Sequence, residues 1–156
     1  MAQEEHYGNR SLAYSAWHRR RSTGRFVGEQ NARKLAMIDM DHCMWIEYDD
    51  GTKEPLALIE EAQDVGQSVK AGTVTRNLAR RAGLPALVVL WKPSEDKNPA
   101  DSDQQDIAQF RVKRLWPIPE SEWRTLTPKE WAAALLRMRT WHIDKLDRLL
   151  FGDRSA

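Results

Sequence analysis

Apolar runs alternate with turn-forming residues along the chain, and this pattern predicts a small β-sheet. Residues 35–48 (LAMIDMDHCMWIEY) form the first long run and are expected to be one long strand. Asp49-Asp50-Gly51 supplies a tight turn, because glycine accepts the positive φ that such a turn needs. Residues 55–60 (PLALIE) then return as a second strand, which we expect to pair antiparallel with the first.

The next segments predict a helical crossover and two further strands. Residues 72–82 carry apolar side chains at helical spacing, and Gly83 stands where a helix commonly ends. Residues 86–91 (ALVVLW) are apolar on both faces, which is typical of an interior strand. The helix before it implies that this strand runs parallel to the second one. Residues 93–102 are expected to form a charged loop, and residues 107–115 a fourth strand.

Helices are predicted near both ends of the chain. Residues 10–21 suit a helix that Ser22-Thr23-Gly24 ends. Thr127-Pro128-Lys129-Glu130 is a capping box with proline at the first helical position, and apolar residues recur at helical spacing from Trp131 to Leu150. His142 lies on that apolar stripe and is expected to be a core histidine. The fold class is therefore α/β: a small mixed sheet of about four strands flanked by helices, with a long C-terminal helix.

Length and composition favour one cytoplasmic domain. The 156 residues suit a single domain, in which residues 1–9 are a polar tail expected to be disordered. Cys43 is the only cysteine, so an internal disulfide is excluded and a reducing compartment is expected. No apolar run approaches the length of a membrane span, so we expect no membrane association.

Charge is nearly balanced, at +1, but the basic residues gather in blocks. Such blocks can bind phosphate even when the total charge is small, and they can equally be solvated faces. We predict nucleic-acid contacts for two of them, made of Arg19, Arg20, Arg21 and Arg25 in the first and of Arg76 and Arg80 in the second.

Carboxylates stand on both predicted strands of the first pair. Asp39 and Asp41 belong to the first strand, and Glu60 ends the second. Carboxylate oxygens brought together in this way suit Mg²⁺ or Mn²⁺, which can activate water for attack on a phosphate. Two alternatives stay open: a solvated hairpin edge, or a transition-metal site that adds His42 and Cys43.

The order of these elements resembles the core of the PD-(D/E)XK nuclease superfamily. Residues 14–19 (YSAWHR), 38–41 (IDMD), 46–48 (IEY) and 55–60 look similar to small phage and prophage proteins of that type. The resemblance implies a metal-dependent endonuclease acting on DNA, with Mg²⁺ or Mn²⁺ as cofactor. Its catalytic and metal-binding residues would be Asp39 or Asp41 together with Glu60.

One position departs from the pattern of that superfamily. Ala62 stands where the superfamily carries a lysine that stabilises the attacked phosphate. Lys53, Lys70 and Arg76 are the available substitutes on neighbouring elements. The departure leaves a second expectation open: a non-catalytic phage protein that binds and inhibits a host defence complex through protein–protein contacts.

Overall fold

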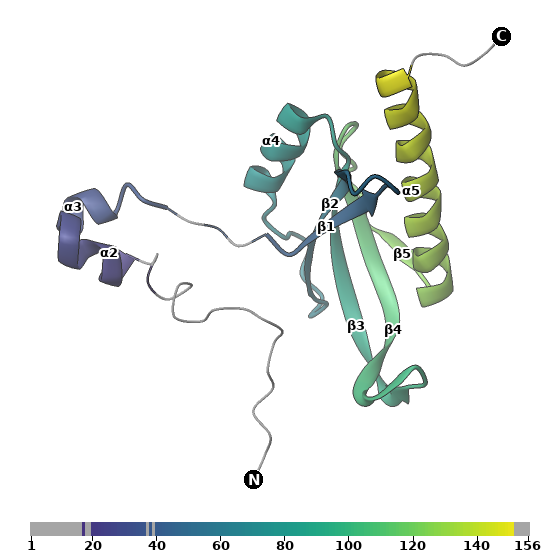
Figure 1. Ribbon diagram of the computed structural model, residues 1–156. Helices are drawn as coiled ribbons and strands as arrows, with labels where there is room; N and C mark the ends of the chain where they lie inside the picture. The colour runs from purple at the N-terminus through teal and green to yellow at the C-terminus, as the bar shows by residue number, and fades with distance from the viewer. Residues whose placement is uncertain (1–16, 18–19, 37, 39, 152–156) are drawn as a thin grey trace. The chain divides into compact units, whose positions relative to one another are not determined.

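The computed structural model describes residue 17, residues 20–36, residue 38 and residues 40–151 of the chain. Contacts divide the chain into two compact units, Met1–Asp39 and Met40–Ala156, and each is described by itself. The larger unit holds a β-sheet with two helices (Figure 1). None of the helices in the described part is long and apolar enough to cross a membrane.

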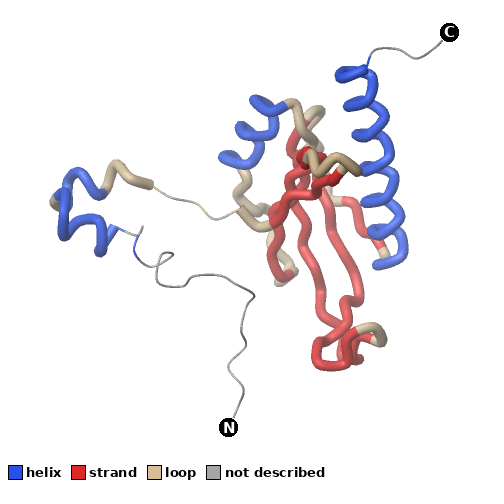
Figure 2. Tube along the Cα trace, in the orientation of Figure 1, coloured by secondary structure: helices blue, strands red, loops and turns tan. Residues whose placement is uncertain are grey.

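The sheet has five strands that lie in the order of the sequence (Figure 2). β1–β2, β3–β4 and β4–β5 are antiparallel pairs, whereas β2 and β3 are parallel. The predicted mixed sheet, its antiparallel first pair and its parallel crossover are confirmed. The short fifth strand was not predicted. The strands are β1 His42–Glu47, β2 Lys53–Gln63, β3 Ala86–Asn98, β4 Asp101–Trp116 and β5 Arg124–Leu126.

Helix α4 (Thr73–Ala82) makes the crossover between β2 and β3, as predicted. Gly83 ends it in the left-handed conformation, with φ of 69°. The N–H of Leu84 then donates to the carbonyl of Ala79 at 2.9 Å, which closes the helix end. The carbonyl of Pro85 accepts the N–H of Leu58 at 2.9 Å, so β3 starts directly beside β2.

Helix α5 (Pro128–Phe151) begins at the predicted capping box. The N–H of Glu130 donates to Thr127 Oγ1 at 3.2 Å, and the N–H of Thr127 donates to Glu130 Oε2 at 2.8 Å. His142 is buried as expected, and burial is the main cause that lowers its pKa to about 4. Leu149 belongs to the apolar repeat predicted from Trp131 to Leu150, but 73% of it is exposed, so the buried stripe does not extend to it.

Thr127→Ala is expected to lower the free energy of unfolding by about 1 kcal/mol, because it removes the N-cap hydrogen bond. Denaturant unfolding measures this change. Thr140→Ala on the same helix is the control: its hydroxyl donates only to the carbonyl of Leu136, four residues earlier. A loss at Thr140 equal to that at Thr127 would contradict the capping role.

The two helices cover opposite faces of the sheet. On one face, Leu58 and Ala86 pack against Ala79 of α4. On the other face, Leu87 and Val89 pack against Trp131 of α5. Consecutive residues of β3 thus point to opposite layers, which explains why residues 86–91 of this strand are all apolar.

Two predicted elements of the larger unit have other bounds. The first strand covers only His42–Glu47, because the pairing with β2 begins at His42; Leu35 and Ile38 lie outside the sheet and are exposed. Residues 93–102 form no loop: β3 and β4 continue as a hairpin whose turn lies between Asn98 and Asp101. Asn98 Oδ1 accepts the N–H of Ala100 at 2.9 Å and stabilises that turn.

The first unit has a helix further along the chain than predicted. α2 is Arg20–Val27 and α3 is Glu29–Ala32, so Ser22-Thr23-Gly24 lies inside a helix and does not end one. A Cβ on Gly24 would stand 3.7 Å from the Cβ of Ala32, which is an ordinary van der Waals contact, so α2 and α3 pack against each other at this point. The turn between them falls at Gly28, with φ of 81°. Residues 10–16, 18 and 19 of the predicted helix are outside the described residues, and Trp17 is helical.

Candidate functional site

The first two strands bring Asp41 beside Glu60. The antiparallel register pairs His42 with Ile59, and its continuation by one residue puts Asp41 opposite Glu60. The N–H of Glu61 donates to Asp41 Oδ2 at 2.7 Å, which fixes the exposed aspartate against β2. Side chains opposite each other in such a pair share a face of the sheet. Two of the three predicted carboxylates are therefore neighbours.

Glu60 points into the layer between the sheet and α4. It is only 5% exposed, and the hydroxyl of the buried Thr75 on α4 donates a short hydrogen bond to its Oε1. Its Oε2 takes no hydrogen bond from the part of the chain that the structure describes. A Cβ on Gly72 would stand 2.8 Å from Leu115 Cδ1, so glycine allows α4 to start close to the sheet and to deliver Thr75 to Glu60.

The described residues contain no group of three or more histidine, cysteine or acidic side chains that could hold a metal ion. Asp41 and Glu60 supply two carboxylates, whose oxygens suit a hard divalent cation. Asp39, the remaining predicted ligand, lies outside the described residues. A divalent site would therefore rest on Asp41 and Glu60, with water completing the coordination.

The zinc alternative has little support from the geometry of β1. His42 and Cys43 are consecutive strand residues, which pair with Ile59 and Leu58 and point to opposite faces. The thiol of Cys43 contacts the carbonyl of Met44 at 3.5 Å, and partial burial raises its pKa. A raised pKa disfavours the thiolate that binds zinc.

The position two residues after Glu60 lacks a cation. It is held by Ala62, which lies on β2 on the same face as Glu60 and is half-buried. The ammonium of Lys53 lies 5.6 Å from the centroid of the Trp45 ring. Lys70 is half-buried before α4, and Arg76 is exposed on α4 directly after the threonine that binds the glutamate. Arg76 is thus the substitute closest in sequence to a residue of the site.

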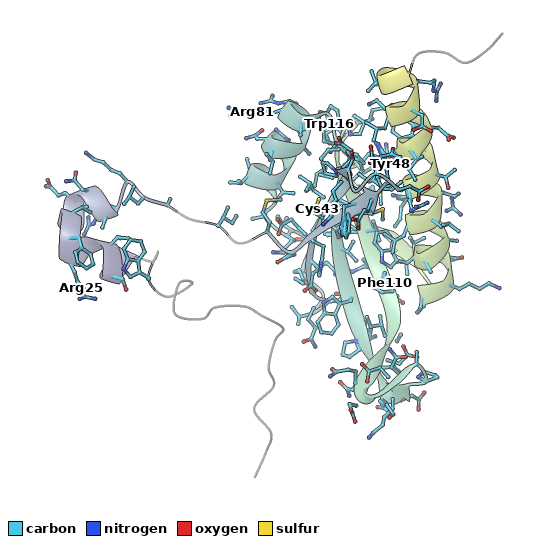
Figure 3. The ribbon with its side chains drawn as sticks, in the orientation of Figure 1. Arg25, Cys43, Tyr48, Arg81, Phe110 and Trp116 are labelled. Carbon is cyan, nitrogen blue, oxygen red and sulfur yellow. The ribbon has the colours of Figure 1, made fainter. Side chains whose placement is uncertain are left out.

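The predicted phosphate-binding arginines fall in both units. Arg76 and Arg80 are exposed on α4, the helix that covers the glutamate, and Arg81 projects from the end of that helix (Figure 3). Arg25 of the smaller unit is exposed, with its guanidinium 5.1 Å from the centroid of the Phe26 ring. Arg20 and Arg21 lie in α2, but their side chains are not described. Arg19 is outside the described residues.

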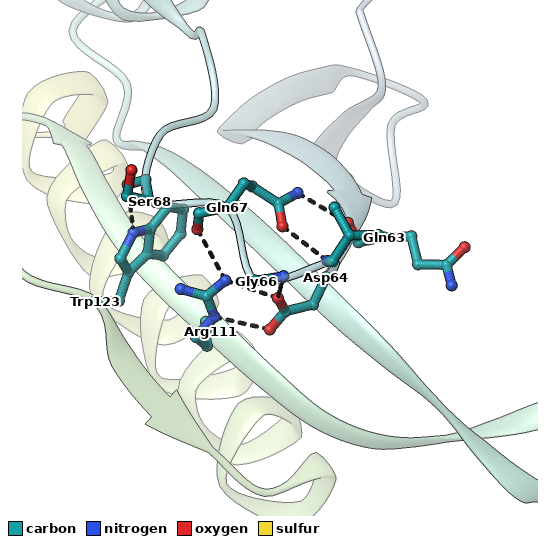
Figure 4. A network of polar contacts seen from close by, with 8 residues as sticks. Gln63, Asp64, Gly66, Gln67, Ser68, Arg111 and Trp123 are labelled. Carbon is teal, nitrogen blue, oxygen red and sulfur yellow. Dashed lines mark hydrogen bonds and ion pairs between the residues drawn. The ribbon is translucent and has the colours of Figure 1, made fainter.

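An ion pair that the sequence did not suggest holds the end of β2 against β4 (Figure 4). Arg111 donates from Nη2 to Asp64 Oδ1 at 2.6 Å and from Nε to Asp64 Oδ2 at 2.7 Å. These hydrogen bonds, with one from the N–H of Gly66, lower the pKa of Asp64 to about 2. Arg111 also donates to the carbonyl of Gln67 at 2.9 Å, so the segment after β2 is fixed in place.

Trp123 closes the same network from the segment before β5. Its ring lies 5.2 Å from the Arg111 guanidinium and 4.7 Å from the Lys113 ammonium, measured to the ring centroid. Its Nε1 donates to the carbonyl of Ser68 at 2.8 Å. The partners are up to 55 residues apart, and no local spacing reveals them. Because the charge of Arg111 is already paired with that of Asp64, this network is a structural clamp.

Comparisons of the chain with protein-family models, with curated proteins and with solved structures find no match. The chain's own residues therefore carry any statement on function.

Proposed function

We propose that this protein is a divergent nuclease-fold protein of the PD-(D/E)XK type, which binds Mg²⁺ or Mn²⁺ and acts on DNA. The observation that carries the proposal is the position of Asp41 against β2, where its Oδ2 accepts the N–H of Glu61, the residue next to Glu60, at 2.7 Å. The antiparallel hairpin, the α4 crossover and the parallel β3 support it, because they surround these carboxylates in the order that the resemblance implies.

Each part of the site has a separate task in this proposal. Asp41 and Glu60 hold the cation, which supplies polarisation of a phosphate and activation of water. Arg76 and Arg80 of α4 bind backbone phosphates, which makes DNA binding depend on salt concentration. Because Ala62 places no fixed positive charge beside the glutamate, catalysis is expected to be weak.

A second candidate is a non-catalytic protein that binds a partner protein on the same fold. Two observations favour it: Ala62 lacks the charge that catalysis needs, and Glu60 is buried with Thr75 on one of its oxygens. A metal-binding experiment separates the two candidates.

Mn²⁺ at ten times its dissociation constant is expected to stabilise the wild-type protein by about 1.4 kcal/mol. For a protein of this size, that change raises Tm by roughly 3 to 6 °C in a thermal melt. Glu60→Gln should abolish the rise, because the variant keeps an oxygen for Thr75 but loses the carboxylate. Glu61→Gln is the matched control, since its side chain binds Trp91 Nε1 and should leave the rise intact.

Equal stabilisation of wild type and Glu60→Gln, or none in either, would overturn the metal site and leave the partner-binding protein. A second arm measures DNA cleavage with Mn²⁺ present. Ala62→Lys is expected to raise the rate at least about tenfold, because it restores a cation beside the attacked phosphate. The double variant Ala62→Lys with Glu60→Gln is the control. If its cleavage rate is as high as that of Ala62→Lys alone, cleavage does not use this site.

A further inference from the structure

A cleft of about 710 Å³ lies on the α5 face of the sheet, away from the layer that contains Glu60. Cavities of this size hold small molecules or the side chains of a bound peptide. Its walls combine two kinds of side chain, which are the aromatic rings of Trp91, Phe110 and Trp131 and the carboxylates of Glu61, Asp103 and Asp106.

The aromatic walls are held in place by their neighbours. Phe110 of β4 and Trp131 of α5 lie with their ring centroids 5.9 Å apart, and Phe110 sits between the sheet and the helix (Figure 3). The indole N–H of Trp91 donates a short hydrogen bond to Glu61 Oε2. The cleft is therefore largely formed before any ligand enters, which lowers the entropic cost of binding.

The charge of the cleft is negative and uncompensated. None of the described residues that line it is a lysine or an arginine, and His42 is the only histidine among them. Glu61, Asp103 and Asp106 form no ion pair with any described residue. Carboxylates beside aromatic faces attract guanidinium and ammonium groups, through ion pairs and cation–π contacts together.

The strand beside the cleft has an open edge. β5 pairs with β4 only at residues 110–112, so residues 101–109 of β4 have no strand on that side within the described chain. The β3–β4 hairpin extends beyond the rest of the sheet (Figure 2). Its backbone N–H and C=O groups on this edge can pair with an added extended segment.

We propose that this cleft binds an extended, arginine-bearing segment of a partner protein, which pairs with the open edge of β4 and inserts its cationic side chains between the rings and carboxylates. An extended peptide presents alternate side chains to one face, so the cationic side chains on that face can reach the rings and carboxylates that line the cleft. This inference is independent of the metal site and concerns the opposite face of the sheet.

The test uses the full chain and a fluorescently labelled peptide of nine residues with arginine at every second position. Fluorescence anisotropy should give a dissociation constant in the micromolar range. The same peptide with citrulline in place of arginine keeps the shape without the charge, and it should bind at least tenfold more weakly. Free arginine amide should also bind at least tenfold more weakly, because it cannot pair with the strand.

Asp103→Asn combined with Asp106→Asn is expected to weaken binding of the arginine peptide at least tenfold. Glu95→Gln combined with Asp96→Asn is the matched control, because it removes two exposed carboxylates of the same hairpin that do not line the cleft. The control should stay within twofold of wild type. Each of three outcomes would overturn the proposal. They are equal weakening in both variants, absence of binding, and equal affinity for arginine amide and for the peptide. Thermal melts of both variants confirm that they are folded.

Discussion

Leu90→Ala is expected to lower the free energy of unfolding by about 2 to 5 kcal/mol, since a fully buried leucine leaves a cavity when it is truncated. Leu90 is 0% exposed and stands in β3, the central strand, where it pairs with Ala62 of β2 and Arg111 of β4. Neighbouring strands on both sides limit how far the site can collapse. Urea or guanidinium unfolding of the purified variant measures the change.

Leu136→Ala is the matched control for this substitution. Leu136 lies on α5 and is 63% exposed, so its truncation removes little contact and is expected to stay within about 0.5 kcal/mol of wild type. A similar loss at both leucines would mean that the centre of the core is not at β3.

The topology of the sheet could be predicted because residues at each turn indicate that turn by themselves. Gly51 adopts φ of 84°, which the hairpin between β1 and β2 needs, and Gly83 ends α4 in the left-handed conformation. A helix between two strands then implies a parallel pair. These signals lie within a few residues of the turns that they form.

Element bounds depend on distant partners and were less predictable. The apolar residues before His42 looked like strand, but the pairing with β2 starts only at His42, and the side chain of Asp41 takes the N–H of Glu61. Residues 93–102 looked like a loop because they are charged and contain proline. In the structure Pro93 falls at an irregularity of the β3–β4 pairing, so a residue without an N–H does not end the hairpin.

The candidate site shows the same division between local and distant information. The nearness of Asp41 and Glu60 followed from an antiparallel hairpin alone. The burial of Glu60 beneath Thr75 did not, because it depends on how closely α4 approaches the sheet at Gly72. The cleft beside Trp91 was also missed, since its carboxylates come from β2 and from the far end of the β3–β4 hairpin.

The Asp64–Arg111 ion pair is expected to make stability depend on pH in the acid range. Asp64 has its pKa lowered from 3.8 to about 2, chiefly by the hydrogen bonds from Arg111. A lowered folded-state pKa means that the contribution is complete above about pH 4 and is lost as pH falls towards 2. One pKa unit corresponds to about 1.4 kcal/mol, so this shift contributes on the order of 2 kcal/mol.

Asp64→Asn should therefore lower the free energy of unfolding at pH 7 by about 2 to 4 kcal/mol, since Arg111 would keep a half-buried charge without its partner. The difference between wild type and variant should shrink between pH 4 and pH 2, as wild-type Asp64 takes up its proton.

Asp96→Asn removes an exposed carboxylate that forms no ion pair with the described residues, and it should change stability at pH 7 by less than about 0.5 kcal/mol. Unfolding curves of the three proteins at pH 7, 4, 3 and 2 measure both quantities. A wild-type advantage over Asp64→Asn that stays constant down to pH 2 would show that this carboxylate does not titrate in the predicted range, and that the ion pair does not couple folding to pH.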